Sequence, residues 1–207
     1  MQAVNQDGLG TQHAGTEKAP LSARAEDIEA IVARASTNEE QAWAELIGLY
    51  SRRVYALAKS RLGDQHLAEE ITQAVFVVVF QYVTDGRYQA KGRFEPWLFR
   101  IAINRIRDHI RRTTRRPGHT HETGSLASAP AKTWDGHEEM DRLRDAVSQL
   151  PQTDQEIIAL RHQAGLEFKG IADLLDEPVG TLLARHHRAL AKLRRLLNPA
   201  AAHENTA

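Results

Sequence analysis

Residues 166–197 have the pattern of a helix-turn-helix, and this motif constrains the fold more strongly than any other feature of the chain. The short apolar stretch at residues 168–175 predicts one helix, and the polar pair Asp176 and Glu177 predicts a tight turn after it. Pro178 predicts the start of a longer helix, because its fixed φ suits the first turn and its missing N–H is not needed there. The motif indicates a fold built from packed helices.

The longer helix is predicted to have two different faces. Five residues recur at steps of three and four and therefore share one face, which is mostly cationic: Thr181, Arg185, Arg188, Lys192 and Arg195. A second, mostly apolar stripe is predicted to pack inward: Leu182, His186, Ala189, Leu193 and Leu196. A cationic helix that follows a tight turn can enter the DNA major groove. The simpler alternative is an amphipathic helix whose charged face contacts only solvent.

Charge is distributed unevenly along the chain. The 27 Lys and Arg balance the 27 Asp and Glu, so there is no general affinity for polyanions, but residues 87–116 contain ten Lys and Arg against two acids. The absence of cysteine excludes disulfides and thiolate metal sites. No apolar run approaches the roughly 20 residues that span a bilayer, and the N-terminus lacks the pattern of a signal peptide. We therefore expect a cytoplasmic protein without membrane insertion.

Two helical blocks separated by a linker are predicted. Residues 1–24 lack periodicity and indicate a disordered tail. Residues 113–137 are rich in Thr, Gly, Pro, Ser and His, which is typical of a flexible linker. The blocks then occupy residues 25–112 and 138–198, with a short tail at 199–207. The expected fold class is all-α, with two small helical domains.

Residues 75–80, with the sequence VFVVVF, are ambiguous in secondary structure. Their β-branched and aromatic side chains favour a buried strand by propensity. No partner strand is evident elsewhere, however, and the preceding AEEITQ is typical of a helix. The context therefore predicts one helix across residues 68–83.

The helix that begins at Pro96 carries the basic cluster. At about 100° per residue, four of its polar residues fall within a sector of roughly 60°: Arg100, Asn104, Arg107 and Arg111. A cationic face with aromatic neighbours suits nucleic acid, and unpaired bases in particular. Trp97 and Phe99 are nevertheless expected in the core, because large aromatic residues at helical spacing usually pack inward.

Three segments together resemble the extracytoplasmic-function (ECF, or group 4) sigma factors of bacterial RNA polymerase. Residues 67–76, LAEEITQAVF, are similar to the region 2 helix that grips the polymerase. Residues 94–112, which contain FEPWLFRIAIN and DHIRR, are similar to the segment that reads the promoter −10 element. Residues 150–189 are similar to region 4. The resemblance covers about residues 40–197, and the order of the segments around a linker makes it specific.

The resemblance implies an initiation factor that binds core RNA polymerase, at the β′ clamp helices and the β flap, and directs it to promoter DNA. Region 2 would dock on the clamp helices through Glu69, Glu70, Ile71, Gln73 and Phe76. It would take the opened −10 element as single-stranded DNA through Arg87, Tyr88, Gln89, Lys91, Arg100, Asn104, Arg107 and Arg111. Region 4 would read the −35 element through Thr181, Arg185, His187, Arg188 and Lys192.

The resemblance further implies an anti-sigma factor as a regulatory partner, and no cofactor, metal or catalytic residue. The chain departs from the family pattern at several positions. Ala74 stands where an acid is frequent, and Leu183 stands where a basic residue is common. Asp176 stands where the turn often has glycine, but Asp tolerates the left-handed conformation better than most residues do.

Two other classes of protein fit parts of the sequence. A helix-turn-helix regulator with an N-terminal sensing domain shares the C-terminal motif, but it does not require the basic segment that ends at residues 108–112. An enzyme with a metal site would draw on His119, His121 and His137. These histidines lie in the predicted linker, and the sequence after His137 is not the HExxH zinc pattern. We therefore expect no enzyme.

Overall fold

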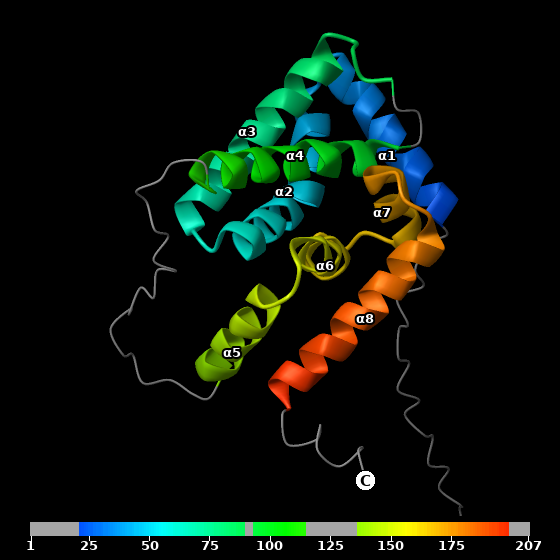
Figure 1. Ribbon diagram of the computed structural model, residues 1–207. Coiled ribbons are helices and arrows are strands. Elements are labelled where there is room, and N and C mark those ends of the chain that lie inside the picture. Colours follow the sequence, from blue (N-terminus) through cyan, green and yellow to red (C-terminus); the bar gives the residue numbers. More distant parts are fainter. Residues whose placement is uncertain (1–20, 90–92, 115–135, 199–207) are drawn as a thin grey trace, which may run out of the picture.

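The computed structural model describes residues 21–89, 93–114 and 136–198, and within these ranges it is helical without any strand. Four helices form an N-terminal bundle: α1 (Leu21–Ser36), α2 (Glu40–Leu62), α3 (Gln65–Thr84) and α4 (Phe94–Thr114). A C-terminal bundle follows: α5 (Gly136–Ser148), α6 (Gln152–Ile158), the π-helical segment η1 (Ala159–Gln163), α7 (Phe168–Leu175) and α8 (Val179–Leu197). Figure 1 shows the two bundles one above the other. The predicted all-α fold class with two domains is confirmed.

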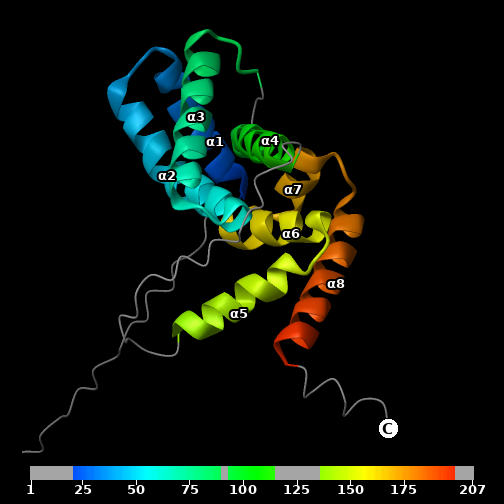
Figure 2. The same cartoon turned by 60° about the vertical axis from the view of Figure 1, so that its left-hand side comes forward.

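The junction between α2 and α3 follows from two residues. Gly63 adopts a positive φ of 72° and ends α2, with its N–H donating to the Lys59 carbonyl at 2.9 Å. Asp64 then caps α3, because its side chain accepts from the Leu67 N–H at 2.9 Å. A two-residue connection of this kind sets α2 and α3 side by side (Figure 2).

The ambiguous stretch at residues 75–80 lies inside α3, as predicted from its context. Val75, Val79 and Val83 are buried on one face of this helix and belong to the core of the N-terminal bundle. By length and composition alone, α3 is also apolar enough to cross a membrane. Of its most apolar 18-residue stretch, 22% is buried inside the protein. The remainder of its apolar surface faces outward and bears on binding, as described below.

The helix-turn-helix has the predicted geometry. Asp176 ends α7 in the left-handed region, with φ 58° and ψ 44°, which Asp tolerates better than most residues do. Pro178 stands immediately before α8. Leu182, Ala189 and Leu193 of α8 are buried, so the apolar stripe packs inward.

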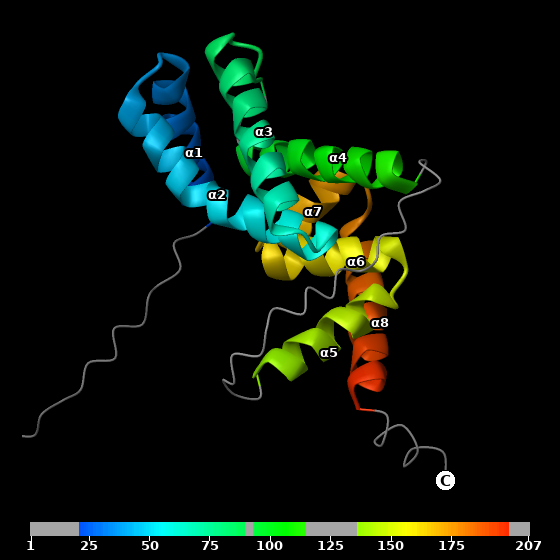
Figure 3. The ribbon, with the colours of Figure 1, turned by 90° about the vertical axis from the view of Figure 1, so that its left-hand side faces the viewer.

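One hydrophobic core joins the two bundles. Tyr50 and Phe99 of the N-terminal bundle and Leu160, Leu166 and Ile171 of the C-terminal bundle are fully buried in the same cluster. In all three ribbon views α7 lies against α4, and η1, which continues α6, contacts α2 (Figure 3). A second, smaller core fills the space between α5 and α8. The sequence predicted both domains but not their packing against each other.

Several predicted segments lie wholly or largely outside the described residues. These are most of the predicted N-terminal tail, most of the linker and the tail at residues 199–207. Lys91, predicted to contact the −10 element, also lies outside them. Within the described part, α1 begins at Leu21 and α5 begins at Gly136, slightly before the predicted limits at 25 and 138.

Candidate polymerase and nucleic-acid interfaces

The outer face of α3 carries most of the residues predicted to contact the polymerase. Glu69, Glu70 and Gln73 are exposed on this face. Ile71 and Phe76 are half-buried and pack against the core, so less of each side chain is available to a partner. The five predicted residues therefore divide into an exposed set and a set that also supports the fold.

Val77 and Phe80 complete the exposed face, and the sequence interpretation missed both. The side chain of Val77 is 55% exposed and that of Phe80 is 44% exposed. At about 100° per residue they fall in the same sector as Gln73, whereas the buried valines lie on the opposite side. The Phe80 ring also contacts Trp43 of α2, with ring centroids 5.0 Å apart. We define the α3 outer face as Glu69, Glu70, Gln73, Val77 and Phe80.

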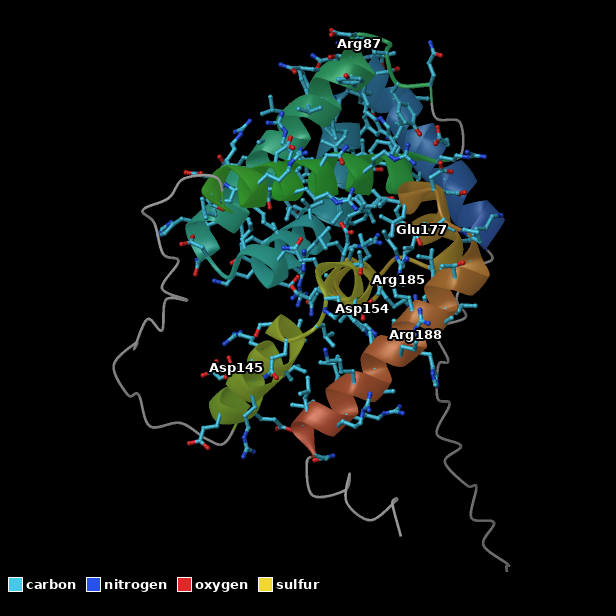
Figure 4. The ribbon with its side chains drawn as sticks, viewed as in Figure 1. Arg87, Asp145, Asp154, Glu177, Arg185 and Arg188 are labelled. Carbon is cyan, nitrogen blue, oxygen red and sulfur yellow. The ribbon has the colours of Figure 1, made fainter. Side chains whose placement is uncertain are left out.

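The loop after α3 is anchored to the end of that helix. The backbone N–H groups of Arg87 and Tyr88 both donate to the Tyr82 carbonyl, at 2.9 and 3.0 Å. The Arg87 guanidinium lies 4.3 Å from the centroid of the Tyr82 ring, a cation–π contact. Arg87 and Gln89 are exposed, and Figure 4 shows Arg87 at the tip of the N-terminal bundle, far from α8.

Tyr88 turns inward and joins an aromatic cluster. Its ring centroid lies 4.8 Å from that of Trp97 and 5.6 Å from that of Phe94. Its hydroxyl donates to Glu29 of α1 at 2.7 Å. Burial, together with this hydrogen bond, raises the pKa of Tyr88 above its usual value, so the ring stays neutral.

The expectation that Trp97 and Phe99 belong to the core is met in different degrees. Phe99 is fully buried, whereas Trp97 is half-buried and packs against the core from the aromatic cluster. Tyr82 adjoins Trp97 with ring centroids 6.0 Å apart. Part of the indole therefore stays accessible beside the loop that carries Arg87.

The predicted cationic face of α4 is exposed, and two of its arginines also contact the C-terminal bundle. Arg100 donates to the backbone carbonyl of Asp173 in α7. Arg107 forms a bidentate ion pair with Glu156 of α6, with nitrogen–oxygen distances of 3.0 and 2.7 Å. Further along the helix, Arg111 pairs with Asp108 one turn away, and Asn104 is exposed.

The residues predicted to read duplex DNA lie along α8. Thr181, His187 and Arg188 are exposed. Arg185, in contrast, forms a bidentate pair with Glu177 of the preceding turn at 3.0 and 2.6 Å, and this hydrogen bonding raises its pKa. Figure 4 shows Glu177 in the turn before α8, with Arg185 and then Arg188 further down that helix.

Lys192 lies toward the C-terminal end of α8. It donates to the Gln149 carbonyl at 3.0 Å and so ties α8 to the end of α5. Of the predicted face, Thr181, Arg188 and Arg195 are exposed, while Arg185 and Lys192 are engaged within the bundle.

The histidines of the C-terminal bundle form a contact that does not resemble a metal site. His162 and His186 approach with their Nε2 atoms 3.0 Å apart and their ring centroids 5.2 Å apart. These two distances place both Nε2 atoms almost on the line that joins the two ring centroids, as in a direct N–H···N hydrogen bond. Among the described residues no group of three or more His, Asp or Glu is arranged to hold a metal. His119 and His121 lie outside the described residues, as does the side chain of His137.

Known sequences match both bundles. The family model for Sigma-70 region 2 matches residues 46–116, and that for Sigma-70 region 4 matches residues 140–193. RNA polymerase sigma factor CarQ of Myxococcus xanthus is 31% identical over 159 residues, which cover 76% of this chain and 90% of CarQ. ECF RNA polymerase sigma factor ShbA of Streptomyces griseus is 30% identical over 182 residues, which cover 82% of this chain and 94% of ShbA.

Solved structures share the fold. The structure of CnrH in complex with the cytosolic domain of CnrY has a TM-score of 0.63 at 22% identity and covers 82% of this chain and 96% of that chain. The sigma factor RpoE of Bartonella quintana, in complex with the anti-sigma factor NepR, has a TM-score of 0.61 at 21% identity and covers 75% of this chain and 96% of that one.

The N-terminal bundle matches region 2 and has a basic helix beside aromatic residues, and the C-terminal bundle matches region 4 and has a helix-turn-helix. Together they define an initiation factor of the sigma-70 class. Within that class the chain belongs to the ECF RNA polymerase sigma factors. Sigma factors are regulatory proteins, not catalytic ones. The alternative of a regulator with an N-terminal sensing domain is set aside, because the N-terminal bundle matches region 2.

Proposed function

We propose that this sigma factor captures the −10 element of its promoters as single-stranded DNA on α4 and the loop before it. The aromatic cluster beside the cationic helix carries this proposal. Trp97 and Tyr82 offer ring faces for an unpaired base, and stacking of a base on an aromatic side chain contributes roughly 1–3 kcal/mol. Arg87 of the loop and Arg100 and Arg107 of α4 suit the phosphates, whose contacts add salt-dependent affinity.

The α3 outer face is the proposed contact with the clamp helices of core polymerase. Exposed apolar side chains flanked by acidic and amide groups are typical of protein interfaces, which place an apolar centre within a polar rim. Val77 and Phe80 form such a centre, and Glu69, Glu70 and Gln73 form its rim. The C-terminal bundle would contact the β flap.

The −35 element is proposed to lie against Thr181 and Arg188 of α8. Replacing Arg188 with alanine is expected to lower transcription from a −35-dependent promoter about tenfold, because one good base or phosphate contact is worth roughly 1–3 kcal/mol. Arg194→Ala is the matched control, since Arg194 is exposed on the same helix but points away from the Thr181 side. Run-off transcription with each variant measures the difference, and equal output from the two would remove Arg188 from the reading face.

An anti-sigma factor is the proposed regulatory partner, and the cytoplasm is the proposed location. Support comes from the similar RpoE structure, which is a complex with the anti-sigma factor NepR. The accessible α3 outer face gives such an inhibitor a surface shared with the polymerase. An inhibitor bound there would exclude polymerase by direct competition.

Run-off transcription tests the proposed function. Core RNA polymerase is incubated with genomic fragments, including the segment upstream of the protein's own coding region, with and without the protein. We expect discrete start sites that depend on the protein, with a common pair of upstream elements. If no such start site appears and the protein does not bind core polymerase, the proposed function is wrong.

A further inference from the structure

Four arginines of the N-terminal bundle donate hydrogen bonds to the C-terminal bundle. Each guanidinium donates to an acceptor across the interface: Arg53 to the Ala164 carbonyl at 2.6 Å, Arg61 to the Gln155 side chain at 2.7 Å, Arg100 to the Asp173 carbonyl, and Arg107 to the Glu156 carboxylate. Two of these, Arg100 and Arg107, belong to the face of α4 that is assigned to −10 DNA. The interface therefore uses the same cations that the DNA would need.

Glu156 is the centre of this contact. It is only 8% exposed, and it is the one buried charged residue among those that the structure describes. Its two carboxylate oxygens accept from two nitrogens of Arg107. A bidentate carboxylate matches the guanidinium as a phosphate group does. Glu156 thus presents to Arg107 the same charge and geometry that a DNA phosphate would present.

Burial of apolar surface adds to these polar contacts. Leu160, Leu166 and Ile171 of the C-terminal bundle are fully buried in the core that they share with α2 and α4. At Gly170 of α7 the two bundles are in ordinary contact, because an added Cβ would lie 3.8 Å from the Pro96 side chain of α4. A strand of DNA that took the guanidinium groups of Arg100 and Arg107 would have to displace their contacts with α6 and α7.

We propose that the α6–α7 surface around Glu156 is a binding surface for α4, which competes with single-stranded −10 DNA. In the free protein this contact holds the two bundles closed, and the bundles must separate before α4 can receive DNA. The inference rests on the proposed function, because that function assigns α4 to the −10 element. The proposed polymerase contact lies on the α3 outer face. Separation of α4 from α6 and α7 is therefore a step distinct from polymerase binding.

A reversible disulfide tests whether separation is needed. The chain contains no cysteine, so Pro96→Cys with Gly170→Cys introduces a unique pair across the interface. The oxidised, cross-linked protein is expected to lose about tenfold or more of its run-off transcription, and reduction is expected to restore it. The two single-cysteine variants are the controls and should respond to neither treatment.

The outcomes of this experiment separate the two proposals. Failure of the pair to cross-link under oxidation, or full transcription by the cross-linked form, would overturn the closed state. If wild type and the reduced variant are both inactive with core polymerase, the proposed function itself fails.

Removal of the phosphate-like charge tests the competition directly. Glu156→Gln keeps the shape of the side chain but weakens the pair with Arg107. We expect it to bind a fluorescein-labelled, mixed-sequence single strand of 20 nucleotides about fivefold more tightly than wild type in fluorescence anisotropy. Glu139→Gln removes the same charge from an exposed site on α5 and is expected to match wild type. Equal affinity of the two variants would show that Glu156 does not compete with DNA, provided that circular dichroism shows both to be equally helical.

Discussion

Replacing Leu160 with alanine is expected to lower the free energy of unfolding by about 2–5 kcal/mol, the range for a fully buried leucine that leaves a cavity. Leu160 has 0% exposure and lies in η1, where the C-terminal bundle contacts α2. Because the core is common to both bundles, the substitution should destabilise the N-terminal bundle as well as its own.

Tryptophan fluorescence can detect this coupling. Trp43 and Trp97 both lie in the N-terminal bundle, and the remaining tryptophan, Trp134, can be replaced by phenylalanine in every protein compared. Urea unfolding followed by this signal then reports on the N-terminal bundle alone. A shift of its midpoint by Leu160→Ala would show that the shared core couples the bundles.

Leu143→Ala is the matched control for this experiment. Leu143 lies on α5, is 38% exposed and belongs to neither core cluster, so its loss is expected to cost about 0.5 kcal/mol or less. An unchanged midpoint of the tryptophan signal in Leu160→Ala would contradict a common core, even if the C-terminal bundle unfolded more easily by circular dichroism.

The features that the sequence predicted correctly are local and periodic. The helix through residues 75–80, the turn at Asp176 and the inward stripe of α8 each depend on neighbours within a few positions. Helix periodicity and turn chemistry are readable at that range. The cationic residues of α4 and α8 likewise share one face of each helix, as their spacing predicts, whereas their role in binding DNA stays a prediction.

The pairing of the charged residues was not predictable in the same way. Arg107 and Glu156 are 49 positions apart, and they meet only because the C-terminal bundle docks on α4. Glu156 carries no signal in the sequence, since its neighbours predict only one more amphipathic helix. Arg185 shows the same limit at shorter range, because its bidentate contact with Glu177 depends on the angle between turn and helix.

The apolar members of the α3 outer face were missed for a different reason. Residues 75–80 are apolar almost throughout, so the pattern does not reveal which side chains are buried. Only the packing of α3 against α2 and α4 separates the buried Val75 and Val79 from the exposed Val77 and Phe80. An apolar run that is longer than the core requires is itself a signal of a binding surface, because the excess side chains must face outward.

Replacing Val77 with aspartate is expected to weaken binding to core RNA polymerase about 10- to 100-fold, which corresponds to roughly 1.4–2.8 kcal/mol. The proposed interface would bury Val77 at its apolar centre, and a carboxylate there would lose its water without gaining a partner. The substitution should not disturb the fold, because Val77 is 55% exposed and is absent from the core.

Leu49→Asp is the control, since Leu49 of α2 is similarly exposed at 49% and lies outside the α3 outer face. Anisotropy of the fluorescently labelled sigma factor, titrated with core polymerase in the absence of DNA, compares the two variants with wild type. A loss of affinity that is equal in both would point to a general effect of added negative charge. Wild-type affinity in Val77→Asp would place the polymerase contact elsewhere on the N-terminal bundle, and the exposed apolar side chains of α3 would then need a different partner.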